Sequence, residues 1–139
     1  MDIFVYGTLR DEGVRNAVLG HAVPVVINAT KPGFSQRWVK GATYPMIKPM
    51  EGQVAQGVIL CGLPESDVAR LDAFEGENYE RRPSTAIAED GSTRDVYIYE
   101  ETAGFEDGGF FDLADWAARL RGDFIAGFMK GRGFDEPEN

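Results

Sequence analysis

The sequence has little cysteine, little histidine and no long apolar run, and each scarcity excludes a class of protein. Its 139 residues include one cysteine, Cys61, which cannot form an internal disulfide. One cysteine and one histidine, His21, also rule out the common zinc sites built from thiolates and imidazoles. No apolar run reaches the roughly 20 residues of a membrane-spanning helix. We therefore expect no metal and no membrane partner, with His21 at the surface and Cys61 in a buried strand.

Positive charge is scarce as well. The chain carries 14 Lys and Arg against 23 Asp and Glu, a net charge of -9. Such a balance argues against nucleic acid or an anionic membrane as the main partner, although a local pocket can still attract a small anionic substrate. The chain also lacks a Gly-x-Ser-x-Gly elbow, a phosphate-binding lysine loop and a dinucleotide fingerprint. Because the start, Met1 and Asp2, is unlike a signal peptide, we expect a cytoplasmic protein.

What the chain does contain is enough apolar surface for one core. Hydrophobic residues make up 43% of it, which is typical of a globular protein, and the length predicts one domain. We place this domain at residues 1–133. The acidic segment 134–139 is expected to be a frayed tail.

Short runs of β-branched and aromatic residues predict a mostly antiparallel sheet, curled toward a barrel, with a few helices packed outside. The expected extended segments are residues 2–6, 22–30, 34–39, 43–47, 53–60, 79–88 and 93–99. Turns are expected at Lys31–Gly33, at Glu51–Gly52 and, as a hairpin, at Glu89–Ser92. Pro45 should lie at an edge or at a strand end, because it cannot donate to a sheet.

Three helices are expected. One covers Asp11–Leu19 and stops at Gly20, and a second, short helix begins at Pro64. The third follows Asp112, a suitable capping residue, and continues to Lys130. Its apolar residues recur at helical spacing and form one stripe, made of Leu113, Trp116, Ala117, Leu120, Phe124 and Phe128. A loop is expected at Gly104–Gly109.

Glu75 is the first candidate for chemistry. It ends the short helix that begins at Pro64, between the apolar Phe74 and the chain-reversing Gly76. The carboxyl end of a helix carries partial negative charge, which disfavours a second negative charge, and desolvation acts in the same direction. Both effects raise the pKa of Glu75 toward the range that suits a general base. The alternative is a solvated acidic residue in a helix-end loop.

The second candidate is the turn that follows the first strand, Tyr6, Gly7, Thr8 and Leu9. A strand that runs into a glycine turn can direct consecutive backbone N–H groups at one point and so bind a carboxylate or an oxyanion. The alternative is an ordinary glycine at the end of a strand. The turn gains a function only if Glu75 lies across from it.

Taken together, these stretches resemble the gamma-glutamylcyclotransferase-like superfamily, and more closely its plant and bacterial branch, the avirulence-induced-protein-like proteins. The resemblance covers roughly residues 1–99. The residues that carry it are Val5–Arg10, Leu71–Gly76, Tyr79 and Arg82, together with Tyr44, Pro45, Gly57 and Val58.

The resemblance implies an α+β fold, a small mixed, mostly antiparallel β-barrel with flanking helices. It implies that Tyr6–Leu9 (Tyr6, Gly7, Thr8 and Leu9) binds substrate through backbone N–H groups and that Glu75 is the catalytic base. Tyr44, Tyr79 and Arg82 are expected to shape the pocket.

The reaction implied is attack of the α-amine of a γ-glutamyl compound on its own γ-carbonyl, which yields 5-oxoproline and a free amine or amino acid. Such a closure requires no cofactor, because well-aligned intramolecular reactions reach effective molarities of about 10^5 to 10^8 M. Two alternatives stay open: acyl transfer or amide cleavage on another γ-glutamyl-like compound, and a non-catalytic module that binds small carboxylates. The leaving amine and the oligomeric state are not specified by the sequence.

Overall fold

A computed structural model describes residues 1–102 and 104–134 of the chain. The tail expected at 134–139 lies outside the described residues, apart from Phe134, whose ring packs against Phe74 at a centroid distance of 5.7 Å. Within the described ranges, no helix is long and apolar enough to cross a membrane.

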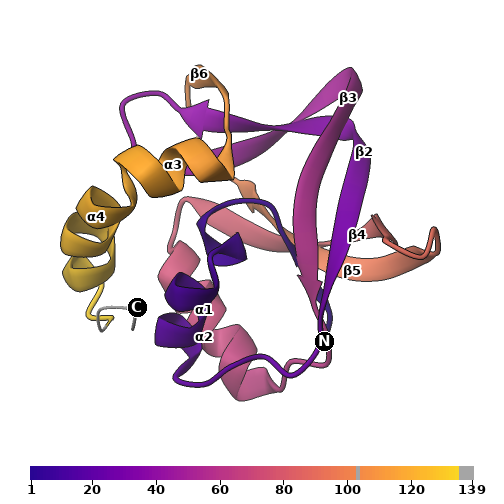
Figure 1. Ribbon diagram of the computed structural model, residues 1–139, viewed down its shortest axis with the longest axis horizontal. Helices are drawn as coiled ribbons and strands as arrows, with labels where there is room; N and C mark the ends of the chain where they lie inside the picture. Colours follow the sequence, from indigo (N-terminus) through magenta and orange to yellow (C-terminus); the bar gives the residue numbers. More distant parts are fainter. Residues whose placement is uncertain (103, 135–139) are drawn as a thin grey trace.

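Five strands close into a barrel (Figure 1). They are β1 (Ile3–Val5), β2 (Val26–Val39), β3 (Pro45–Leu60), β4 (Tyr79–Ala88) and β5 (Thr93–Glu101). Their order is β3-β1-β5-β4-β2, and β2 pairs again with β3 to complete the circle. The β1–β5 pair is parallel and the other pairs are antiparallel. The expected mixed, mostly antiparallel barrel is therefore confirmed, as is the hairpin that joins β4 to β5.

Two helices lie side by side at one end of the barrel (Figure 1). Helix α1 (Glu12–Leu19) begins at Asp11, whose carboxylate accepts a hydrogen bond from the Val14 amide at 2.9 Å, and it ends at Gly20. Helix α2 (Glu65–Glu75) begins after Pro64 and ends at Gly76. Both helices match the sequence-based expectation.

The turns expected in the two longest strands are wrong. Strand β2 runs through Lys31–Gly33, and β3 runs through Glu51–Gly52. The ladder passes from Pro32 opposite Val54 to Phe34 opposite Pro49, so both glycine-containing segments fall at one irregularity. A glycine with positive φ on each side lets the paired strands bend there without reversing.

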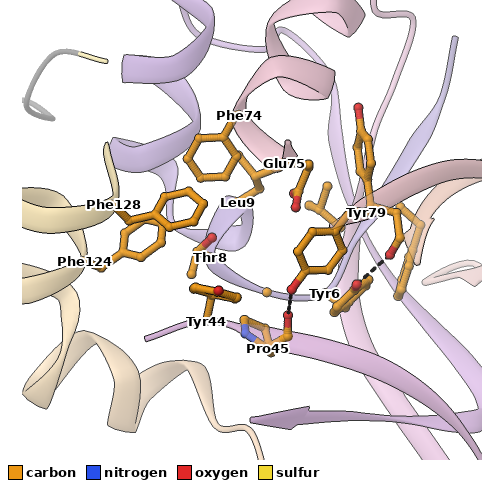
Figure 2. Close-up of a pocket in the computed structure, with 14 residues that line it drawn as sticks. Tyr6, Thr8, Leu9, Tyr44, Pro45, Phe74, Glu75, Tyr79, Phe124 and Phe128 are labelled. Carbon is orange, nitrogen blue, oxygen red and sulfur yellow. Dashed lines mark hydrogen bonds between the residues drawn. The ribbon is translucent and has the colours of Figure 1, made fainter. Parts of the chain in front are cut away.

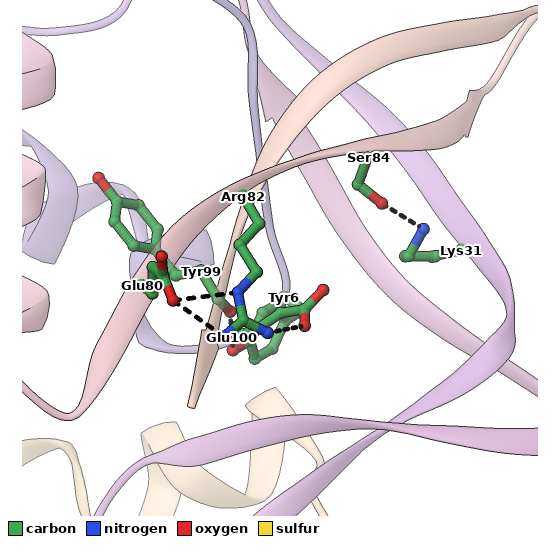
Figure 3. Close-up of polar contacts among 7 residues, drawn as sticks. All are labelled: Tyr6, Lys31, Glu80, Arg82, Ser84, Tyr99 and Glu100. Atoms are coloured by element: carbon green, nitrogen blue, oxygen red, sulfur yellow. Dashed lines mark hydrogen bonds and ion pairs between the residues drawn. The ribbon is translucent and has the colours of Figure 1, made fainter. Parts of the chain in front are cut away.

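Lys31 joins β2 to β4 at the point where their backbone pairing ends. That ladder contains only the pairs Ala29–Ala88 and Thr30–Ile87. Beyond it the buried Lys31 amine donates to the Ser84 hydroxyl at 2.7 Å and to the Thr85 carbonyl at 2.8 Å (Figure 3). Burial lowers the pKa of this amine. The side chain thus replaces the missing ladder bonds.

The third expected helix is broken into pieces. It forms α3 (Leu113–Arg119), a short turn α4 (Arg121–Asp123) and a π-helix η2 (Phe124–Met129), with an interruption at Leu120. Of the expected apolar stripe, Trp116 and Phe124 are fully buried, and three further members, Leu113, Leu120 and Phe128, are half-buried. Ala117 is exposed, so the stripe faces the core except at this residue. The expected loop at Gly104–Gly109 contains part of a further strand, β6 (Asp107–Phe110), which pairs with β2.

The core has two parts. One fills the barrel, and the other lies between the barrel and the helices. Gly57 belongs to the barrel wall, where a Cβ atom would lie 2.6 Å from the Phe4 ring, so only glycine fits there. Trp116 in the second part donates its indole N–H to the Thr43 carbonyl at 2.7 Å, which anchors the segment that leads into β3 beside the helices.

Candidate active site

A hollow lies where the end of β1, the start of β3, the end of α2 and η2 meet (Figure 2). The empty space in it, including the part open to solvent, measures about 420 Å³. It is lined mainly by aromatic side chains and by the turn after β1. The lining residues are Phe4, Val5, Tyr6, Gly7, Thr8, Leu9, Tyr44, Pro45, Phe74, Glu75, Tyr79, Tyr99, Phe124 and Phe128.

Glu75 is the only acidic residue among those lining residues. It is the last residue of α2, and its carboxyl group points toward the ring of Tyr79 (Figure 2). Burial raises its pKa from the ordinary 4.5 to about 8, Arg132 lowers it, and Asp72 raises it. A carboxyl group with such a pKa can take up and return a proton near neutral pH.

The turn after β1 lines the same hollow and has unused backbone donors. It continues as a 3-10 turn, η1 (Thr8–Arg10), closed by the Arg10 amide on the Gly7 carbonyl and the Asp11 amide on the Thr8 carbonyl, both at 3.0 Å. Within the described part of the chain, the amides of Gly7, Thr8 and Leu9 donate to no carbonyl or side chain. These three donors are therefore available to an anion.

Gly7 is required by the close approach of β3. A Cβ atom at this position would lie 2.6 Å from Cγ of Pro45. Since Pro45 begins β3, the glycine lets that strand close over the turn.

Two tyrosines that line the hollow already donate their hydroxyl protons to backbone carbonyls. Tyr79 donates to the Pro45 carbonyl at 2.7 Å, and Tyr6 donates to the Tyr99 carbonyl at 2.6 Å. Burial raises the pKa of both phenols above their ordinary value, so they stay protonated. Their oxygens can then only accept a further hydrogen bond. Together with Glu75 they form a group of acceptors that suits an ammonium ion.

The opposite wall is aromatic (Figure 2). Phe124 and Phe128 of η2 stack at a centroid distance of 4.8 Å, and Tyr44 packs against Phe128 at 5.2 Å. Helical spacing in the sequence predicts only a core role for Phe124 and Phe128. Their distance in sequence from Glu75 gives no signal that they would wall the same hollow.

Arg82 does not line this hollow, contrary to expectation. It is exposed, and its guanidinium binds Glu80 at 2.9 Å and Glu100 at 3.1 Å (Figure 3). Alternate residues of a strand point to opposite faces, so Tyr79 and Arg82, three positions apart, cannot face the same way. The other residues expected at the site, Tyr6–Leu9, Tyr44, Glu75 and Tyr79, all line the hollow.

His21 and Cys61 lie outside the hollow. His21 is exposed and contacts the buried Asp67 of α2, with 2.8 Å between Nε2 and Oδ1, a partner that the sequence did not indicate. Cys61 is half-buried and follows the end of β3 rather than lying inside a strand. Among the residues that the structure describes, no three His, Cys, Asp or Glu side chains gather in a way that could hold a metal ion.

Known proteins resemble this chain in sequence. The family model described as "Gamma-glutamyl cyclotransferase, AIG2-like" matches residues 3–118. AIG2-like protein A of Arabidopsis thaliana is 33% identical over 132 residues, which cover 93% of this chain and 79% of the relative.

Solved structures resemble it in fold. The solution structure of an Arabidopsis thaliana protein has a TM-score of 0.68 and 31% identity, and covers 99% of this chain and 94% of that protein. A structure titled "Gamma-glutamyl cyclotransferase" has a TM-score of 0.60 at 20% identity, with coverage of 76% and 68%. The second likeness indicates a shared fold alone.

Proposed function

The chain belongs to the gamma-glutamyl cyclotransferase, AIG2-like family, and on that basis we propose that it cyclises γ-glutamyl compounds to 5-oxoproline with release of an amine. The observation that carries the proposal is that Glu75, with its raised pKa, and the free amides of Gly7–Leu9 line one hollow. A small γ-glutamyl compound presents the two groups that these residues suit, an α-ammonium and an α-carboxylate.

Binding follows from the donors and acceptors of the hollow. The α-carboxylate accepts hydrogen bonds from the amides of Gly7, Thr8 and Leu9. The α-ammonium donates to Glu75 and to the phenol oxygens of Tyr6 and Tyr79.

The chemistry is an intramolecular acyl transfer. Glu75 removes a proton from the α-ammonium, and the free amine attacks the γ-carbonyl carbon. A carbon–nitrogen bond closes the five-membered ring as the bond to the leaving nitrogen breaks. Two protons pass from the attacking to the leaving nitrogen by way of Glu75, so the leaving group departs as an ammonium ion and Glu75 is regenerated.

A pKa near 8 suits this transfer, because it brings the carboxyl group close to the range of the amine that it must deprotonate. Since the base has to be ionised, we expect kcat/KM to rise with pH up to about 8. No covalent nucleophile is needed, because the reacting atoms belong to one molecule.

The test is release of 5-oxoproline from a panel of γ-glutamyl amines and γ-glutamyl dipeptides. Glu75→Gln keeps the shape of the side chain and removes its ability to accept a proton, so we expect turnover to fall by about 100-fold or more. Glu80→Gln is the matched control, since Glu80 is exposed and does not line the hollow.

Equal turnover by Glu75→Gln and the unmodified protein would remove Glu75 from the mechanism. If the unmodified protein released no 5-oxoproline from any compound, yet bound glutamate or 5-oxoproline in calorimetry, the proposal would give way to a non-catalytic carboxylate-binding module. Release of a different product would instead indicate acyl transfer or amide cleavage.

A further inference from the structure

The positively charged side chain of Arg132 lies beside residues that form the rim of the hollow. Its guanidinium carbon lies 4.2 Å from the centroid of the Phe128 ring. The guanidinium also lies close to Gly76, where a Cβ atom would come within 3.2 to 3.4 Å of its atoms. The guanidinium thus contacts an aromatic ring and lies beside a residue without a side chain.

The neighbours of Arg132 belong to the site. Phe128 lines the hollow, and Gly76 directly follows Glu75. Arg132 lowers the pKa of both Glu75 and Tyr79, as expected of a cation close to these two groups. Its backbone amide donates to the Phe128 and Met129 carbonyls at 3.2 and 3.1 Å, which fixes the residue to the end of η2.

The N–H groups of the Arg132 guanidinium are not taken up by an ion pair. Arg132 is exposed, and among the described residues no carboxylate lies within ion-pair distance of it. Contact with an aromatic face occupies the plane of a guanidinium, whereas its N–H groups point outward from the edges. An edge of this kind binds a carboxylate through two parallel hydrogen bonds.

We propose that Arg132 is a specificity-determining residue that binds a carboxylate on the leaving half of the substrate, so that γ-glutamyl amino acids are preferred over γ-glutamyl amines without a carboxylate. This inference rests on the proposed function. With the α-carboxylate on the Gly7–Leu9 amides and the α-amine at Glu75, the glutamyl half fills the inner part of the hollow. The leaving half therefore projects outward, past Phe128 toward Arg132.

Arg132 could instead act only by stabilising the ionised form of Glu75. This alternative predicts a different result from carboxylate binding. Such an effect would change the turnover of every substrate by the same factor. Carboxylate binding changes only the turnover of substrates that carry the carboxylate. The ratio of kcat/KM for two matched substrates separates these roles, because any effect on Glu75 cancels in it.

The experiment compares γ-glutamyl-alanine with γ-glutamyl-ethylamine, which has the same leaving group without its carboxylate. We expect the unmodified protein to prefer γ-glutamyl-alanine by about tenfold, the scale of a charge-assisted hydrogen bond at an accessible site. In Arg132→Gln this preference should disappear through a higher KM for γ-glutamyl-alanine, with little change in kcat. Arg132→Lys should restore part of it, because an ammonium keeps the charge and loses the fork.

Lys130→Gln is the matched control, since it removes one positive charge from the same segment and should leave the preference intact. Circular dichroism and thermal unfolding of each variant verify that it folds. No preference in the unmodified protein, or a preference that survives in Arg132→Gln, would overturn the inference.

If no γ-glutamyl compound is turned over, the proposed function fails and the inference is decided by calorimetry with the same two compounds. Tighter binding of γ-glutamyl-alanine that is lost in Arg132→Gln supports a carboxylate site at Arg132. Equal binding of the two compounds, or no binding of either, overturns it.

Discussion

The two faces of β4 place neighbouring side chains in opposite surroundings. On one face Tyr79 lines the hollow and donates to Pro45, and Arg81 pairs with Asp72 of α2 at 3.0 Å. On the other face Glu80 and Arg82 are exposed and pair with each other. The first face joins the strand to the helix that carries Glu75, whereas the second displays charge to water.

The difference shows that position along the strand decides what a polar side chain can do. Tyr79 is desolvated and its pKa is raised, while Arg82 keeps its contact with water. Both residues belong to the family resemblance, but only one face of the strand reaches the hollow. Residues an odd number of positions apart on a strand point to opposite faces, so a sequence motif can group residues that do not share a site.

The largest effect is expected at Glu75, the buried acid in the hollow that the enclosed face of β4 lines, and it concerns the pH dependence of the free energy of unfolding. Between pH 4.5 and about 8 the folded protein keeps the Glu75 proton and the unfolded chain loses it, so rising pH favours unfolding. The free energy of unfolding should fall by as much as about 1.4 kcal/mol per pH unit over this range. In Glu75→Gln this contribution should be absent.

Urea unfolding of both proteins at several pH values measures that difference. His21, whose pKa is raised by its hydrogen bond to Asp67, also stabilises the fold at low pH, but equally in both proteins. Their difference therefore isolates Glu75. Parallel pH profiles for the two proteins would mean that Glu75 is fully hydrated in the folded state.

A smaller effect is expected at Tyr79 on the enclosed face. Tyr79→Phe leaves the buried Pro45 carbonyl without its donor, which should cost about 1 kcal/mol of unfolding free energy. Tyr97→Phe is the matched control, because the Tyr97 hydroxyl makes no hydrogen bond within the described ranges. Chemical denaturation compares the two variants, and equal losses would contradict the importance given to the Tyr79–Pro45 bond.

The smallest effect is expected on the exposed face. Arg82→Ala removes surface ion pairs, which contribute little, so both turnover and the unfolding midpoint should stay close to those of the unmodified protein, with turnover changed by less than about twofold. Arg81→Ala, the adjacent change on the other face, should lower the midpoint more, because Arg81 links β4 to α2 through Asp72. Thermal unfolding compares the neighbours, and the reverse order would contradict the assignment of the two faces.

Much of the fold could be predicted from local patterns. Asp11 and Gly20 specify the ends of α1, and the Glu89–Ser92 turn specifies the β4–β5 hairpin, because capping and turn chemistry act over a few residues. The turns expected at Lys31–Gly33 and Glu51–Gly52 are wrong, because a glycine that suits a turn also suits a bulge inside a strand. Both glycines fall at one irregularity of the β2–β3 ladder, which only pairing over a longer range can reveal.

The candidate site could be predicted only in part for the same reason. The resemblance names Glu75 and the Tyr6–Leu9 turn, which line one hollow. Phe124 and Phe128 come from a segment where periodicity indicated a single helix ending at Lys130, and Arg132 lies just beyond that expected end. The interruption at Leu120 changes the direction of the segment (Figure 1). No local pattern relates this segment to Glu75.

Two aromatic residues of η2, Phe124 and Phe128, line the hollow together with Glu75, and this arrangement has a consequence for proton exchange with the solvent. If η2 moved away, water would hydrate the carboxyl group, and at neutral pH it would release its proton. Departure of the helix and loss of that proton are then linked, and linkage works in both directions. Acid would favour the aromatic wall in its place, whereas alkali would favour its displacement.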